Sequence, residues 1–210
     1  ARYSAAGRDR AFGIGPTIDP DSIVDRTIDH LLRRFGGLLI EPWLARTDDL
    51  GLAGIVGTDG CELLGFHQQR VDGAGRFRSV TVSTDRIVAL GLREAEGRAM
   101  RRVGARVGAW LGRSGYRGAF SIDFWHYRDP MNGEIRLNAI GEINARHSMS
   151  HIARAWADRL LRLGRLREGS RVVLEFDATQ HLHADFILAL DPKGGWPLCS
   201  LRIESAATSE

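Results

Sequence analysis

The sequence lacks the features that mark several large classes of protein. Cys61 and Cys199 are the only cysteines, too few and too isolated for a disulfide framework or a zinc site, so a reducing compartment is expected. No apolar run reaches the length of about eighteen residues that a membrane span needs, and no basic region with a following apolar stretch marks a secretory signal. We therefore expect a cytoplasmic protein without membrane contact, and neither cysteine has an assigned chemical role.

Lysine is also almost absent, since Lys193 is the only one, yet the net charge is +3 and the pI is about 9.3. The arginines are spread along the chain and form no basic stripe, which argues against nucleic acid as a partner. Arginine in place of lysine, with abundant glycine and alanine, indicates coding bias and a bacterial-like composition. The chain of 210 residues opens without methionine on a polar, Gly-containing loop, so we expect a piece of a longer protein.

Apolar periodicity and turn residues predict helices alternating with groups of strands. The helices are expected over 20–35, over 94–112, and from a cap at Ser148 or Ser150 to Leu163. Gly104 and Gly108 weaken the second helix but allow it to pack closely on a sheet. The expected strands cover 38–44, 52–56, 61–69, 77–82, 119–125, 140–144, 171–176 and 186–190.

This order of elements predicts an α+β fold, with a mostly antiparallel sheet and helices packed on one side of it. The apolar content of 43% is sufficient for one ordinary core. We expect residues 1–165 to form the main domain and residues 166–210 to be a C-terminal β extension of the same domain.

The most informative segment carries two carboxylates on two adjacent predicted strands. Asn132-Gly133 is a strong hairpin signal, and a turn there places Asp123 opposite Glu142, with Asn144 further along the same face. Like charges directly across a sheet are destabilising unless a cation or a raised pKa relieves them. Oxygen ligands of this kind suit Mg²⁺ or Mn²⁺; the alternative is that Pro130 shifts the register and that these are ordinary polar groups at strand ends.

With these residues the chain resembles the C-terminal, larger part of an ATP-grasp domain. The strongest match is SIDFW, which contains Asp123, followed by GEINAR, which contains Glu142, Asn144 and Arg146. The resemblance implies that Asp123, Glu142 and Asn144 hold Mg²⁺, with Mn²⁺ as an alternative. It also implies that Arg146 lies near the transferred phosphate or the acyl phosphate.

Two further segments resemble the nucleotide-binding parts of that family. YSAAGRDR, with Ser4 and Gly7, is similar to the Gly-rich loop over the phosphates of ATP, where small residues let backbone N–H groups approach closely. IEPWL is similar to the linker that holds adenine, which implies roles for Glu41, Trp43 and Leu44. The acid that takes the ribose hydroxyls then falls on Asp48, or on Asp49 if the loop is one residue longer.

The resemblance implies an ATP-dependent ligase that joins a carboxylate to an amine or thiol through an acyl phosphate, with small-molecule substrates and a homodimer as one option for assembly. The family's phosphate-binding lysines are missing, and so is its N-terminal part, which keeps open a non-catalytic nucleotide-binding or sensing module.

Other residues and other functions are also candidates. The strands whose counterpart in the family faces the acyl-acceptor site carry, on or near them, His67, Gln68, Gln69, Arg70 and Arg78. These residues are candidates for that site, and the alternative is that they lie on a solvated edge of the sheet. His147 and His151 have the spacing of two zinc ligands on one helix, although no third ligand is adjacent. Asp123 and Glu142 also fit the acid/base pair of a glycosidase, but that reading leaves Asn144 without a role.

Overall fold

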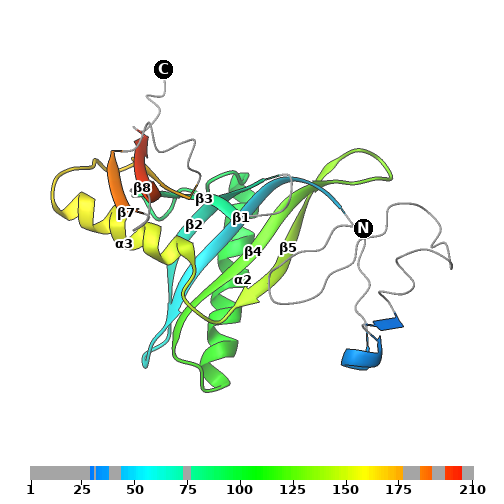
Figure 1. The fold of residues 1–210 in the computed structure, drawn as a ribbon. Coiled ribbons are helices and arrows are strands. Elements are labelled where there is room, and N and C mark those ends of the chain that lie inside the picture. The colour runs from blue at the N-terminus through cyan, green and yellow to red at the C-terminus, as the bar shows by residue number, and fades with distance from the viewer. Residues whose placement is uncertain are drawn as a thin grey trace.

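The computed structural model describes residues 29–30, 32–37, 44–72, 77–176, 185–190 and 197–204. Within them, eight strands form one sheet in the order β5-β4-β1-β2-β3-β6-β8-β7, and each neighbouring pair is antiparallel (Figure 1). The strands are β1 (Ala45–Val56), β2 (Cys61–Val71), β3 (Phe77–Ser83), β4 (Gly118–Arg128), β5 (Ile135–Asn144), β6 (Arg171–Glu175), β7 (Phe186–Leu190) and β8 (Pro197–Glu204). The helices that pack on the sheet are α2 (Glu94–Arg113) and α3 (Met149–Arg162). Residues 29–30 and 32–35 are also helical, and no helix of the described ranges is long and apolar enough to span a membrane.

One face of the sheet, the α2 face, is covered by α2. Leu50 and Leu52 of β1 lie opposite Phe124 and Ile122 of β4. They share a buried core with Phe66 of β2 and with Met100, Val107 and Leu111 of α2. The predicted close packing of this helix is confirmed, because a Cβ at Gly104 would lie 2.4 Å from Leu52 Cδ2 and one at Gly108 would lie 2.2 Å from Cys61 Sγ.

The opposite face, the α3 face, is covered by α3 at its β3–β6 end. Val82 pairs with His67, and successive strand residues point to opposite faces, so Val82 lies on the side away from Phe66 and α2. Val80 and Val82 pack there with Leu174 of β6 and with the α3 residues Ala153, Ala157 and Leu160. The α+β class and the antiparallel sheet are confirmed. The expectation that the helices share one side is not met. The buried apolar residues of β1 and β4 point toward α2, whereas those of β3 and β6 point to the opposite face, toward α3.

Several boundaries differ from those that the sequence predicts. β1 begins at Ala45, before the predicted start at residue 52, because its polar residues alternate with Leu50 and Leu52 and pair on both sides with β2 and β4. β8 was not predicted at all. It pairs with both β6 and β7, so long-range pairing supports a segment whose local pattern is weak. Residues 38–43 of the predicted strand at 38–44 and most of the predicted helix at 20–35 lie outside the described residues, and the described residues 29–30 and 32–35 of that helix are helical.

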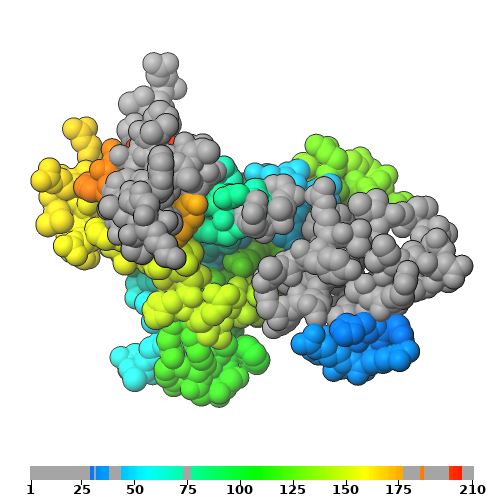
Figure 2. All heavy atoms as spheres, in the orientation of Figure 1, coloured from blue at the N-terminus to red at the C-terminus, as the bar shows by residue number. Residues whose placement is uncertain are grey.

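The β4–β5 hairpin has the predicted pairing of Asp123 with Glu142, but the position of its turn differs from the prediction. Near its tip Arg128 pairs with Ile135, so the turn is centred one residue earlier than Asn132-Gly133. Asp129 and Glu134 close the loop, with the Asp129 N–H donating to Glu134 O at 2.8 Å. Between Asp123 and Trp125 the register shifts, because β5 contains two more residues than β4 at that point. This bulge restores the pairing of Asp123 with Glu142. The hairpin tip and α3 lie at opposite sides of the view in Figures 1 and 2.

Candidate functional site

The predicted metal ligands lie together on the α3 face, beyond the region that α3 covers. Asp123 pairs with Glu142, and Ser121 pairs with Asn144. Asn144 Nδ2 donates to Asp123 Oδ2 at 3.1 Å, and Arg146 NH2 donates to Asn144 Oδ1 at 2.8 Å. The structure thus brings together all four residues of the two strongest motifs.

The electrostatics of this group favour a bound cation. Burial raises the pKa of Asp123 to about 6, and the nearby charge of Glu142 adds to the rise, while the hydrogen bond from Gln69 and the charge of Arg146 oppose it. Glu142 and Arg146 are exposed, so both can turn toward a ligand. A divalent cation between the carboxylates would offset both the burial and the repulsion.

The donor set fits magnesium or manganese better than zinc. Within the described part of the chain, no three or more His, Cys, Asp or Glu side chains are grouped to hold a metal. Here two carboxylates and one amide oxygen are available, which suits an ion that keeps waters and phosphate oxygens as further ligands. Asn144 Oδ1 accepts one hydrogen bond from Arg146, and the second lone pair of this oxygen remains available for a metal.

Gln69 of β2 completes the surroundings of Asp123, although β1 separates the two strands. Its Nε2 donates to Asp123 Oδ1 at 3.2 Å and lies 3.3 Å from His67 Nε2. The intervening β1 residue is Gly51, which pairs with both Asp123 and His67 and has no side chain to block the contact. The sequence predicts a place for Gln69 near an acceptor site but not this contact, because only the sheet order brings β2 and β4 to the two sides of β1.

The two acids considered for the ribose lie on opposite faces of the sheet. Asp48 pairs with His126 and lies on the α2 face, where its Oδ2 is 3.4 Å from His126 Nδ1. Asp49 lies on the α3 face, opposite both Gln69 and Trp125. The structure therefore groups Asp49, and not Asp48, with the Asp123 site.

An aromatic platform adjoins Asp49. The Arg46 guanidinium stacks 3.8 Å from the centroid of the Trp125 ring and binds Asp49 Oδ1 at 3.1 Å. The ring covers Gly141 so closely that a Cβ there would lie 1.7 Å from Trp125 Cζ3. Arg46 was missed as a site residue, since a single arginine between Ala45 and Thr47 carries no pattern.

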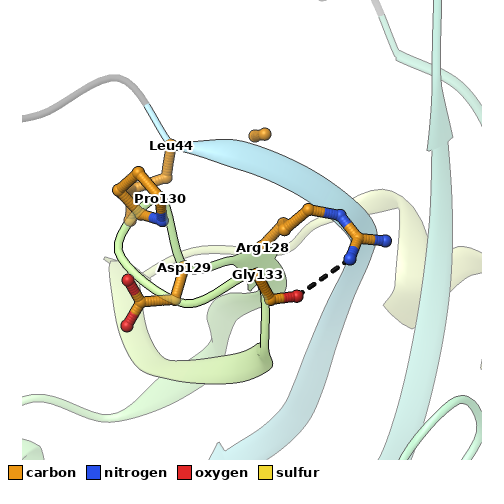
Figure 3. A pocket seen from close by; sticks show the side chains of 6 residues that line it. Leu44, Arg128, Asp129, Pro130 and Gly133 are labelled. Carbon is orange, nitrogen blue, oxygen red and sulfur yellow. Dashed lines mark hydrogen bonds between the residues drawn. The ribbon is translucent and has the colours of Figure 1, made fainter.

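A shallow hollow of about 300 Å³ lies at the hairpin tip, between the start of β1 and the β4–β5 turn (Figure 3). Leu44 forms part of its wall, and Arg128 NH1 donates to Gly133 O at 2.8 Å along one side. This volume is at the lower end of the range for small-molecule sites. Leu44 is the one residue of the predicted adenine linker whose surroundings the structure describes; Glu41, Trp43, Ser4 and Gly7 lie outside the described residues.

The structure does not support the zinc alternative. His151 Nδ1 accepts from the Ser148 N–H at 3.1 Å, and its Nε2 donates to Gly54 O at 3.2 Å. Both ring nitrogens are thus used to cap α3 and to attach it to β1. Arg78, a candidate for the acceptor site, is held by Asp72 in an ion pair of 2.7 Å.

No protein-family model and no curated protein sequence matches the chain, but solved structures do. N5-carboxyaminoimidazole ribonucleotide synthetase from Thermus thermophilus matches with a TM-score of 0.52 and 17% identity, over 84% of this chain and 51% of that chain. A pyruvate carboxylase variant from Rhizobium etli, with the allosteric activator acetyl coenzyme-A, matches with a TM-score of 0.50 and 16% identity, over 88% and 17%. A putative ATP-grasp superfamily protein from Archaeoglobus fulgidus matches with a TM-score of 0.43 and 17% identity, over 77% and 46%.

The chain therefore spans about half the length of the synthetase that it matches. At these identities the likeness is one of fold. The antiparallel sheet with α2 and α3, together with the matches to the synthetase and to the pyruvate carboxylase, shows that the chain has an ATP-grasp-like fold.

Proposed function

We propose that the chain is the larger part of an ATP-dependent ligase that joins a carboxylate to an amine or a thiol, with Mg²⁺ as its metal. One observation carries the proposal. The carboxylates of Asp123 and Glu142 lie in register beside Asn144 and Arg146 on the α3 face of an ATP-grasp-like sheet.

In the proposed reaction, a substrate carboxylate oxygen attacks the γ-phosphorus of ATP, and the bond to the ADP oxygen breaks. The amine or thiol then attacks the acyl carbon, and inorganic phosphate leaves. Such chemistry depends mainly on positioning and on neutralising charge.

Each described residue has a proposed part in this chemistry. Asp123, Glu142 and the Asn144 amide oxygen would hold Mg²⁺, which when bound neutralises charge on the ATP phosphates. Arg146 is exposed and lies beside Asn144, so its guanidinium can move from the amide to a phosphate oxygen as charge develops there. Asp49 replaces Asp48 as the proposed ligand of the ribose hydroxyls, because it shares the face of Asp123.

The remaining parts of the nucleotide site belong to segments outside the described residues. Glu41, Trp43 and the adjoining Leu44 are proposed to contact adenine. Ser4 and Gly7 are proposed to cover the phosphates. These assignments rest on the motifs, and the hollow beside Leu44 supports the placement of adenine near the start of β1.

The first test is calorimetric titration of a non-hydrolysable ATP analogue into the 210-residue chain, with and without Mg²⁺. We expect magnesium-dependent binding, weakened about tenfold or more by Glu142→Gln, because the variant loses one charged metal ligand. Glu168→Gln is the matched control, since Glu168 is exposed in the loop before β6. Equal affinity in wild type and Glu142→Gln would contradict the metal assignment.

A second measurement addresses the reaction class. The proposal predicts ADP release only when a carboxylate and an amine or thiol are both present. Release that is independent of any acceptor would instead indicate a kinase or an ATPase.

A further inference from the structure

A buried histidine beside the site has a defined tautomer. His67 is 2% exposed, and its Nδ1 is buried without a hydrogen-bond partner. Burial lowers the pKa of His67 to about 3, and the charges of His151 and Arg154 add to this effect, so the ring is neutral. Because Gln69 Nε2 can only donate, His67 Nε2 must accept and Nδ1 must carry the proton.

The Asp123 carboxylate and this tautomer of His67 favour the same orientation of the Gln69 amide. One hydrogen on Nε2 faces His67, and the other faces Asp123 Oδ1. If the amide turned over, its oxygen would face both the His67 lone pair and the Asp123 carboxylate, and both contacts would be repulsive. Asn144 donates to the second oxygen of Asp123, so each oxygen of the carboxylate accepts a hydrogen bond from a side-chain amide.

Glycine at position 51 makes the arrangement possible. A Cβ there would lie 2.2 Å from His67 Nε2 and 2.4 Å from His67 Cε1. The imidazole therefore occupies the space above β1 that any side chain at this position would fill.

We infer that Gln69, oriented by His67, is a positioning residue that holds the Asp123 carboxylate in place for metal binding. The inference rests on the proposed function and extends it beyond the metal ligands themselves. Partners of this kind, which contact a metal ligand and not the metal, typically contribute about 10- to 100-fold to metal affinity.

The test is Mn²⁺ titration of the whole 210-residue chain, followed by electron paramagnetic resonance, with a non-hydrolysable ATP analogue present. We expect Gln69→Leu and His67→Phe to weaken Mn²⁺ binding about tenfold or more. His67→Gln can place an acceptor oxygen near the position of Nε2, so it should retain affinity within about threefold. Gly51→Ala should resemble His67→Phe, whereas Gly57→Ala, where a Cβ would meet nothing closer than 3.8 Å, should resemble wild type.

The outcomes separate this inference from the proposed function. If Glu142→Gln loses Mn²⁺ while Gln69→Leu and His67→Phe bind it as wild type does, the positioning role is overturned and the metal site stands. If Glu142→Gln binds Mn²⁺ as wild type does, or if wild type binds no Mn²⁺, both the positioning role and the proposed metal site are overturned.

Nitrogen-15 NMR of wild-type histidines gives a readout that needs no destabilised variant. The Nδ1–H tautomer is expected for His67, and the Nε2–H tautomer would overturn the inference.

Discussion

At the scale of single residues, the carboxylate of Asp123 is the most constrained group of the site. It faces Glu142 across the hairpin and is held by Gln69 and Asn144. Its pKa is raised from 3.8 to about 6, first by burial and then by the charge of Glu142. Without a cation, the folded state therefore binds a proton at Asp123 more readily than the unfolded state does.

This difference predicts the sign of a pH effect on stability. As pH rises from about 4 to about 6, the unfolded chain loses the proton before the folded chain does, so Asp123 makes the protein progressively less stable. Asp123→Asn is neutral throughout, and its stability relative to wild type should rise by about 1–3 kcal/mol across this window, allowing for partial exposure. Urea denaturation at several pH values measures this, with Asp59→Asn in an exposed turn as control. A relative stability of Asp123→Asn that is constant with pH would contradict the raised pKa.

At the scale of elements, the start of α2 is tied to two strands by a charged cluster on the α2 face. His126 of β4 is buried between two acids, with Nδ1 3.4 Å from Asp48 Oδ2 and Nε2 3.3 Å from Glu96 Oε2. Glu96 also accepts from the Arg93 N–H at 3.0 Å, which satisfies a free donor at the helix N-terminus. The side-chain hydrogen bond from Arg93 is the main reason that the pKa of Glu96 is lowered to about 2.

Glu96→Ala should therefore destabilise the protein by about 1–2 kcal/mol, through the loss of the cap and of the contact with His126. Glu94→Ala is the control in the same turn, because Glu94 is exposed and pairs only with Arg98 among the ion pairs described for it. This control should lower the free energy of unfolding by less than about 0.5 kcal/mol.

Since the pKa of Glu96 is lowered from 4.5, the contribution of Glu96 to stability is complete above about pH 4.5 and is lost as pH falls toward about 2. Thermal unfolding at several pH values measures both effects. An equal cost for the two substitutions would contradict the capping role.

At the scale of the whole molecule, one continuous sheet separates two cores. Phe124 belongs to the core beneath α2, and Leu174 belongs to the core beneath α3. β2 and β3 connect these regions through their pairing. The site lies on the α3 face next to the second core, so its geometry depends on the sheet as a unit.

We therefore expect the two cores to unfold together. Phe124→Ala should cost about 3–5 kcal/mol and Leu174→Ala about 2–5 kcal/mol, because each leaves a cavity among fully buried side chains. In each variant, tryptophan fluorescence and far-ultraviolet circular dichroism should report the same urea midpoint. Separate midpoints would show that the cores are independent units.

The local pattern of the sequence was sufficient for most elements and for the centre of the site. Both described helices and the meander of β1, β2 and β3 follow from apolar periodicity and turn residues. The pairing of Asp123 with Glu142 was also predicted, although the true turn lies one residue earlier and a bulge in β5 compensates. Alternation along a strand is a property of neighbouring residues, so the sequence alone determined which side chains share a face within one element.

Only the tertiary structure decided which faces meet. The sheet order brings Gln69 and His67 of β2 across Gly51 to Asp123 of β4. It also places Asp49 with Asp123 and directs Asp48 toward α2. These choices depend on register between strands that are distant in sequence, and register is set by how the two buried faces of the sheet pack and not by any local preference of the chain.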